Sequence, residues 1–500
     1  MSTQVLPDVQ AASRPRALLR SAPYLSAVGL VTVAWLTSHL LYPQPKFPLD
    51  DPYITLHSAQ VLHWGYDPNF PGVSPLYGAT SAPFLGLVYL LLFLLQPLRA
   101  LETACWLGIL AYVLGLVYLT RVLNLSRFAS LSIITLGLTS SFVPVHLLNG
   151  LETPWALAAI IWTLALGTAR RFVLASLAAG IAAAIRPDLL SFAIFVLVAF
   201  VSMQQHERMQ FLLRAVPLAL LPVALCASWY LLQTGHPYPL TALAKSYWMG
   251  STQLPTSYKL FAELSSVRAF AISCGPLLLA LAFAFKYPLV KACAAHMAWI
   301  LVAIYCQLPD ALSWNYYRYA VFAVPMLLYA MALVARSGRA KGLMSFSLAY
   351  SLLVAITLSI PAYFAECRHY DGVLRATSEW CNENLPPDSR ILVQDAGFIS
   401  FATHFRIIDA VGLKTPGAIE LNRRHTLPSG GRNRTEAISS LAHETHPTHL
   451  IVPTKRSEIT HLAQQLQALG WHVEPLKSFG PYTIYSLKPP DASSLTFSNE

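Results

Sequence analysis

A series of long apolar stretches is the feature that most constrains how this chain can fold. Each is close to the length of about 20 residues that a helix needs to cross the hydrocarbon layer of a bilayer. The chain of 500 residues is 55% hydrophobic and only 12% charged, with a mean hydropathy of +0.50. Soluble proteins carry about twice that share of charge, so the sequence predicts a bundle of membrane-spanning helices. The predicted spans are 21–42, 82–99, 102–120, 127–148, 152–168, 172–186, 188–203, 210–232, 267–285, 290–308, 318–335 and 342–363.

The basic residues predict the orientation of these spans. The net charge is +10, but Lys and Arg are scattered over short connections and form no contiguous stripe, so nucleic-acid binding is not expected. Connections rich in Lys and Arg stay in the cytoplasm. The predicted cytoplasmic connections hold Arg170, Arg171, Arg208, Arg214, Lys286, Lys291, Arg336, Arg339 and Lys341. The basic N-terminal arm, 1–20, is placed with them, which puts the loops 43–81 and 232–267 on the outer side.

The region between Pro83 and Gly150 does not fit the regular alternation of cytoplasmic and outer connections. It contains three apolar segments where an even number is required. One of them must therefore be a re-entrant segment or a pair of short helices, and the sequence does not indicate which.

The C-terminal part of the chain differs in pattern from the rest. Short apolar runs such as "RILVQ" (390–394), "THLIVP" (448–453) and "YTIYSL" (482–487) alternate with helical stretches such as 458–470. This alternation is typical of a small α/β domain. The predicted organisation is an arm (1–20), a membrane module (21–363), an outer α/β domain (364–488) and a disordered tail (489–500).

Most of the unusual polar residues fall on the predicted outer side. Each has an ordinary interpretation: the adjacent acids Asp50 and Asp51 could be a solvated loop entry, and Glu152 could favour a helix N-terminus. Taken together, these residues indicate a functional site because all of them are predicted on the same side of the membrane. The candidates on that face are Asp50, Asp51, His57, Ser74, Tyr77, Thr80, Glu152, Arg186, Asp188, His236, Lys245, Tyr317 and Arg318.

These residues lie in motifs that resemble the GT-C superfamily of membrane glycosyltransferases, which use lipid-phosphate sugars as donors. The nearest likeness is to the bacterial branch that includes arabinofuranosyltransferases. The chain departs from the pattern of that branch at Val73, Tyr77 and Leu240, where threonine, tryptophan and asparagine are common. The motifs are "DDPYIT" (50–55), "GVSPLYG" (72–78), "GLET" (150–153), "RPD" (186–188), "GHPYPLTALAK" (235–245), "YYRY" (316–319), "QDAGFIS" (394–400) and "IIDAVGL" (407–413).

The resemblance implies a GT-C-like polytopic bundle of about 11–13 transmembrane helices in a bacterial inner membrane. It also implies an inverting transfer of a sugar, of the arabinofuranosyl or mannosyl type, from a polyprenyl phosphate to an outer glycan or glycoprotein. In this family an aspartate of the first outer loop is the general base, which points to Asp50, with Asp51 as its helper.

The same chemistry needs cations for the leaving phosphate, and the predicted ones are Lys245, Arg318 and Arg186. Glu152, Asp188 and the remaining polar candidates are expected to contact the sugars. No cofactor is required by the sequence. A divalent metal is compatible with the acids, although no ligand spacing demands one.

Three other functions fit parts of the sequence. An O-antigen ligase-like transferase would use a diphosphate-linked donor. A lipid or sugar transporter would place charges inside the spans and repeat broken helices in two halves, whereas the charges here lie at span ends. A membrane scaffold would need no acid pair.

Overall fold

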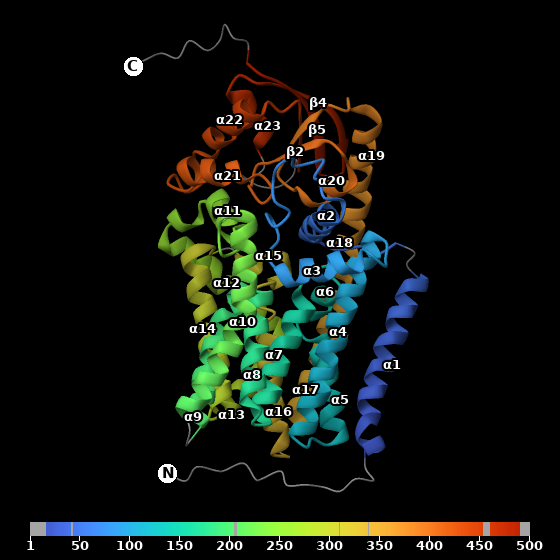
Figure 1. Cartoon of the computed structure of the whole chain (residues 1–500), viewed down its shortest axis with the longest axis vertical. Helices are drawn as coiled ribbons and strands as arrows, with labels where there is room; N and C mark the ends of the chain where they lie inside the picture. Colours follow the sequence, from blue (N-terminus) through green and yellow to red (C-terminus); the bar gives the residue numbers. More distant parts are fainter. Residues whose placement is uncertain are drawn as a thin grey trace.

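The computed structural model describes residues 17–41, 44–204, 208–309, 311–338, 340–453 and 461–490. They form a long bundle of helices with a smaller sheet domain at one end (Figure 1). Most of the predicted N-terminal arm and nearly all of the predicted tail lie outside these residues.

All the predicted spans except 82–99 correspond to helices of the bundle. Six helices of the described chain are long and apolar enough to cross a membrane, and shorter apolar helices of 10–17 residues accompany them. The bundle helices are α1 (Ala17–Leu41), α4 (Pro97–Val122), α5 (Arg127–Thr139), α7 (Thr153–Thr168), α8 (Phe172–Ile185), α9 (Leu190–Met203), α10 (Arg208–Thr234), α12 (Thr256–Cys274), α13 (Leu279–Ala284), α14 (Pro288–Gln307), α16 (Ala323–Arg336) and α17 (Lys341–Val354).

Short helix α3 (Ala82–Leu91) accounts for the disturbed alternation. The predicted span 82–99 is broken, because α3 ends at Leu91 and α4 begins at Pro97. Ten residues of helix extend about 15 Å, half the thickness of the hydrocarbon layer. Helix α3 packs against α2 (Asp51–Trp64) near the sheet domain (Figure 1), so it is the segment that does not span.

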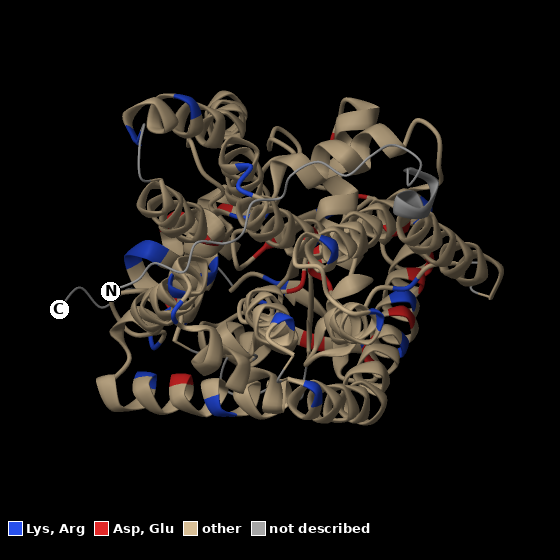
Figure 2. Ribbon diagram, turned by 90° about the horizontal axis from the view of Figure 1, so that it is seen from below, with Lys and Arg blue, Asp and Glu red and all other residues tan. Residues whose placement is uncertain are grey.

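Basic residues gather at the end of the bundle away from the sheet domain. They lie where α4, α7, α13 and α16 end and where α5, α8, α10, α14 and α17 begin. Figure 2 views this end and shows Lys and Arg scattered over it without forming one stripe. The residues at these helix ends are Arg121, Arg127, Arg170, Arg171, Arg208, Lys286, Lys291, Arg336 and Lys341.

The first predicted outer loop contains a buried helix. Helix α2 begins directly after Asp50, with Pro52 in its first turn, a position where proline is well tolerated. Every residue from Pro52 to Val61 is buried, because α2 lies between the bundle and the sheet domain (Figure 1). This helix therefore places Asp51 at the junction of the two parts.

The sheet domain contains five strands, β1 (Arg390–Val393), β2 (Arg406–Asp409), β3 (His449–Pro453), β4 (His472–Phe479) and β5 (Tyr482–Lys488). They run in the order β2-β1-β3-β5-β4. Strand β1 pairs in parallel with β2 and β3, whereas β5 pairs antiparallel with β3 and β4. The helices of this domain are α20 (Gly397–Ala402), α21 (Pro416–Leu421), η8 (Asn422–Thr426), α22 (Arg434–Thr445) and α23 (Leu462–Ala468).

No linker separates the sheet domain from the bundle. A helical run of 44 residues extends from Lys341 to Asn384, past the predicted domain boundary at 363/364. It consists of α17, η6 (Ala355–Ser359), α18 (Ile360–His369), η7 (Tyr370–Leu374) and α19 (Arg375–Asn384).

Short helical pieces fill the remaining connections near the sheet domain. They are α6 (Val143–Leu147), η2 (Pro187–Leu189), α11 (Thr241–Met249), η3 (Ser251–Gln253), η5 (Ala311–Ser313) and α15 (Trp314–Tyr317); η4 (Gly275–Leu278) joins α12 to α13.

Candidate functional site

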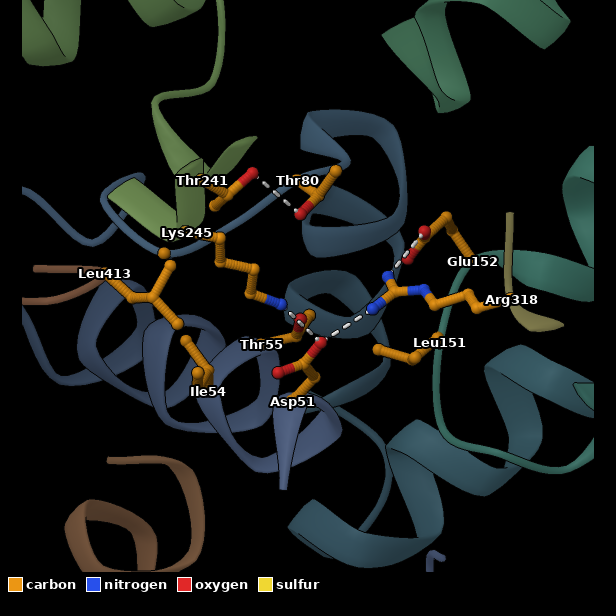
Figure 3. Close-up of a pocket in the computed structure, with 11 residues that line it drawn as sticks. Asp51, Ile54, Thr55, Thr80, Leu151, Glu152, Thr241, Lys245, Arg318 and Leu413 are labelled. Carbon is orange, nitrogen blue, oxygen red and sulfur yellow. Dashed lines mark hydrogen bonds and ion pairs between the residues drawn. The ribbon is translucent and has the colours of Figure 1, made fainter. Parts of the chain in front are cut away.

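A small polar pocket lies where α2, the first outer loop, the start of α7, α11 and Arg318 meet the loop that follows β2 (Figure 3). Its free volume is about 10 Å³, which is room for about one water molecule. The lining residues are Asp51, Ile54, Thr55, Gly78, Thr80, Leu151, Glu152, Thr241, Lys245, Arg318 and Leu413.

Asp51 lies between two cations in this pocket (Figure 3). Its Oδ2 accepts from Lys245 Nζ at 3.1 Å and from Arg318 Nη1 at 2.6 Å. These three residues come from positions far apart in the sequence, on α2, on α11 and just before α16. The pocket therefore holds a carboxylate bound by two positive groups.

The ion pairs continue away from the pocket. Glu152 Oε1 accepts from Arg318 Nη2 at 3.0 Å and from Arg186 Nη1 at 2.7 Å. Arg186 also pairs with Asp188 at 2.9 Å, and its guanidinium lies 4.7 Å from the ring centre of Phe322. Charges alternate along this chain, so Arg318 is held on one side by Asp51 and on the other by Glu152.

The pKa values follow from these partners. Burial raises the pKa of Asp51, but the charges of Lys245 and Arg318 outweigh burial and lower the pKa to about 2. Burial likewise opposes ionisation of Glu152, and Arg318 and Arg186 lower its pKa below the ordinary value. Both acids are therefore carboxylates at neutral pH.

Arg318 follows a strained segment of backbone. Asn315, Tyr316 and Tyr317 have φ values of 48°, 60° and 60°, a left-handed conformation that costs non-glycine residues about 1–2 kcal/mol each. The Tyr316 carbonyl is bonded to His146 Nε2 at 2.8 Å, and the Tyr316 hydroxyl donates to a carboxylate oxygen of Glu366 at 2.7 Å. Such strain persists where the surroundings fix it, often at functional sites.

Asp50 does not line the pocket, unlike its neighbour Asp51, and its role as general base stays a prediction. Its two oxygens accept from the backbone N–H groups of Gly397 and Phe398, both at 2.7 Å. A Cβ at Gly397 would lie 2.2 Å from the Asp50 carbonyl oxygen, so only glycine allows this approach. Burial and the charge of Asp395 raise the pKa of Asp50 to about 8, against the lowering effect of the two N–H donors. A general base must reach the proton it removes, and Asp50 faces the sheet domain instead.

Among the remaining predicted substrate contacts, Thr80 lines the pocket and its hydroxyl lies 3.2 Å from that of Thr241 (Figure 3). Asp188 contacts Arg186, one layer behind the pocket. Tyr317 stacks on Phe142, with ring centres 5.3 Å apart, and it does not line the pocket.

Three other candidates near α10 also lie outside the pocket. Ser74 Oγ donates to Gln233 at 3.4 Å, and the Tyr77 hydroxyl donates to the Thr234 carbonyl at 3.2 Å. His236 is exposed beside Tyr238. These contacts attach the first outer loop to the end of α10.

His57 is buried between α2 and the sheet domain. Its Nε2 donates to Asn69 Oδ1 at 3.0 Å, and Asn69 Nδ2 in turn donates to the Thr403 and Phe405 carbonyls. The structure therefore places His57 in the contact between the two parts of the molecule, outside the pocket lining.

Several lining residues are not among the candidates named from the sequence. Thr55 and Thr241 each lie four residues from a charged pocket residue, Asp51 and Lys245 respectively. Residues at that spacing share a helix face, which is a signal that the sequence offered. Leu413 carried no comparable signal, because the pocket gains it only when the sheet domain docks.

No metal cluster is found in the part of the chain that the structure describes: it contains no group of three or more His, Cys, Asp or Glu that could hold an ion. In the pocket, Asp51 and Glu152 are both engaged by cations. The compatibility of the acids with a divalent metal therefore stays a prediction.

The fold is similar to those of several solved structures. The solved structure of ArnT from Cupriavidus metallidurans is similar in the apo state, with 12% identity over 94% of this chain and 98% of that chain and a TM-score of 0.56. The same protein bound to undecaprenyl phosphate gives a TM-score of 0.55 over 93% of this chain.

The archaeal oligosaccharyltransferase AglB from Archaeoglobus fulgidus, in complex with an inhibitory peptide and a dolichol-phosphate, is also similar. Its identity is 12% over 96% of this chain and 76% of that chain, with a TM-score of 0.51. These neighbours are GT-C glycosyltransferases, so the chain has the GT-C fold, and it is a membrane protein.

Sequence comparison covers only the C-terminal part. A family described as a domain of unknown function, DUF8728, matches residues 363–488. No curated protein matches the chain.

Proposed function

We propose that this GT-C chain transfers a sugar from a polyprenyl-phosphate donor to a glycan or glycoprotein acceptor. The observation that carries the proposal is the pair of cations, Lys245 and Arg318, bound to the single carboxylate of Asp51 in one pocket. Structural neighbours bound to undecaprenyl phosphate and to dolichol-phosphate support a lipid phosphate as the ligand.

Each residue has a role in this reaction. Lys245 and Arg318 bind the donor phosphate, and Asp51 is the general base in place of Asp50. Glu152, backed by Arg186 and Asp188, keeps the Arg318 guanidinium oriented. Charged hydrogen bonds of this kind are shorter and stronger than neutral ones, which suits them to a leaving group that gains charge.

The transfer is a single displacement with inversion. The acceptor hydroxyl oxygen attacks the anomeric carbon, a new glycosidic bond forms, and the bond from that carbon to the phosphate oxygen breaks. The bonding electrons leave with the polyprenyl phosphate, whose added negative charge Lys245 and Arg318 stabilise. The hydroxyl proton goes to the Asp51 carboxylate.

Donor binding would also activate the base. While Lys245 and Arg318 are bound to Asp51, they hold its pKa at about 2, which makes it a weak base. When a phosphate takes over Lys245 and Arg318, Asp51 loses that attraction while burial remains, so its pKa rises. The free volume of about 10 Å³ further requires the pocket to widen when the donor enters.

The charges of the pocket support a neutral sugar. Its lining carries two cations and two carboxylates, which cancel. One donor phosphate therefore already gives the pocket an excess of negative charge, and no cation of the lining is left for a further acid. Arabinofuranosyl or mannosyl donors meet this condition, whereas a uronic acid would bring an unpaired charge into the pocket at a high desolvation cost.

The orientation proposed for the chain is that of a bacterial inner-membrane protein with the pocket and sheet domain outside the cytoplasm. The gathering of Lys and Arg at the other end of the bundle supports it.

The test is to incubate the purified protein with a panel of polyprenyl-phosphate sugars and measure the release of polyprenyl phosphate. One neutral-sugar donor should release it in the presence of an acceptor glycan. The Asp51→Asn variant should lose at least 1,000-fold in rate, as expected when a general base is removed along with its charge, yet still bind undecaprenyl phosphate. Full activity of that variant would contradict the assignment of the base.

A further inference from the structure

Helix α11 carries two lining residues of the pocket, Thr241 and Lys245, on nine residues of helix. Helices this short are unstable in water without tertiary support. The support for α11 comes from the sheet domain, because it packs against α21 and η8 (Figure 1).

Arg434, at the start of α22, makes the principal polar contact with α11. Its Nε and Nη2 both donate to the carbonyl oxygen of Trp248, at 3.1 and 2.9 Å. Its guanidinium also lies 4.8 Å from the centre of the Trp248 ring. The Trp248 carbonyl belongs to the last turn of α11, where carbonyl groups lack partners within the helix. Arg434 therefore caps the C-terminal end of the helix that holds Lys245.

The charge of Arg434 is unusual for its surroundings. The side chain is 6% exposed, and within the described ranges no carboxylate lies at ion-pair distance from it. Burying a cation without a counter-ion costs free energy. Among the described residues, the contacts that offset this cost are the hydrogen bonds to the Trp248 carbonyl and the contact with the Trp248 ring. A cation at a helix C-terminus also interacts favourably with the helix dipole.

Backbone atoms also take part in the contact between α11 and the sheet domain. Gly250, directly after α11, has φ of 63°, and a Cβ there would lie 2.4 Å from the Gly431 nitrogen. The end of α11 and the turn before α22 thus touch through backbone atoms, which leaves α11 little freedom to shift while this contact holds.

We infer that Arg434 is a positioning residue of the sheet domain that holds Lys245 in the pocket through the Trp248 carbonyl. The inference rests on the proposed function, in which Lys245 binds the donor phosphate. It makes the sheet domain a working part of the donor site, because a residue of that domain determines where a phosphate-binding cation lies.

The experiment compares Arg434→Met and Arg434→Lys with the wild-type full-length chain in detergent. Methionine fills the space without a charge, and replacing a buried charge by an apolar group usually leaves a protein folded. Two readouts are used: hydrogen exchange of the 241–249 backbone, and binding of undecaprenyl phosphate alone. Arg406→Ala is the control, since Arg406 is an exposed arginine of the same domain at the start of β2.

Arg434→Met should speed exchange over 241–249 about tenfold and weaken phosphate binding by about tenfold, the value of a hydrogen bond from a charged group. The Arg434→Lys variant should recover part of the exchange protection and part of the phosphate binding, and Arg406→Ala should change neither property. In a Lys245→Ala background Arg434→Met should not weaken binding further, because positioning acts through Lys245.

Unchanged exchange over 241–249 in Arg434→Met would overturn the inference whatever the binding result. An equal loss of binding in both backgrounds would overturn it too. A Lys245→Ala variant that binds undecaprenyl phosphate as tightly as wild type would instead contradict the proposed function.

Discussion

Asp50 and Asp51 are neighbours in sequence but belong to different parts of the molecule. Asp51 starts α2 and faces Lys245 and Arg318, whereas Asp50 accepts two backbone N–H groups from the sheet domain. The motif "DDPYIT" predicted that an acid of this pair acts in the site. The family resemblance pointed to Asp50 as the base and Asp51 as its helper. That Asp51 and not Asp50 lines the pocket could not be predicted, because it depends on where α20 docks against a residue 347 positions earlier.

This difference gives a matched pair of variants. Asp50→Asn should lower the free energy of unfolding by about 1–3 kcal/mol and lower the melting temperature accordingly. The reason is that one N–H group of α20 then faces an amide NH₂ and loses its acceptor. Asp51→Asn should leave the contact with α20 intact. Binding of undecaprenyl phosphate to Asp50→Asn should equal that of wild type.

The two variants are compared by thermal unfolding in detergent and by binding of undecaprenyl phosphate. If Asp50→Asn loses transfer at unchanged melting temperature, the first acid of the pair would be the functional one after all.

Lys245 has a control elsewhere in the chain. Lys245→Ala should raise the donor concentration needed for half-maximal transfer by about tenfold or more, the worth of one charged hydrogen bond to phosphate. Lys291, in the first turn of α14 at the far end of the bundle, is the matched lysine. Steady-state kinetics of Lys291→Ala should match wild type, and equal effects of the two substitutions would count against a phosphate site at Lys245.

At the scale of elements, the contact between α2 and the sheet domain depends on a neutral histidine. His57 Nε2 is the donor to Asn69, and its Nδ1 is buried without a hydrogen-bond partner. Burial, together with the charge of the nearby Lys414, lowers the pKa of His57 to about 4, against the attraction of Asp67. The folded state therefore resists protonation here.

The sign of the pH effect follows. An unfolded histidine takes up a proton below about pH 6.5, whereas folded His57 does so only near pH 4, so stability falls as the pH drops between these values. The shift corresponds to at most about 3 kcal/mol. His57→Gln keeps a donor for Asn69 and removes the titration, so its melting temperature should fall less between pH 7 and 5. Parallel falls in the two proteins would show that another group is responsible.

Sequence patterns predicted some elements well and missed others for physical reasons. Strands β1, β3 and β5 are short apolar runs, and they were predicted. Strand β4 lies at the sheet edge, is mostly exposed and carries Pro475 beside a register shift, so it lacks the apolar alternation that identifies strands. Helix α2 was predicted only as loop because its buried faces include polar residues such as His57 and Ser58.

For the molecule as a whole, hydropathy was sufficient to predict the bundle and the separate C-terminal domain, because both depend on segment composition. The pocket depends on long-range docking. Asp51, Lys245, Arg318 and Glu152 could be named as candidates from their common side of the membrane. Their pairing, and the entry of Leu413 from the sheet domain, required the docked structure.

The helical run from Lys341 to Asn384 has a consequence for how the sheet domain can move against the bundle. The run passes from the bundle into the sheet domain without a loop, so this connection offers the domain no flexible hinge. If the pocket transfers sugars as proposed, an acceptor must therefore bring its hydroxyl to a place that is fixed beside the bundle, because the domain covering the pocket has no hinge at this connection.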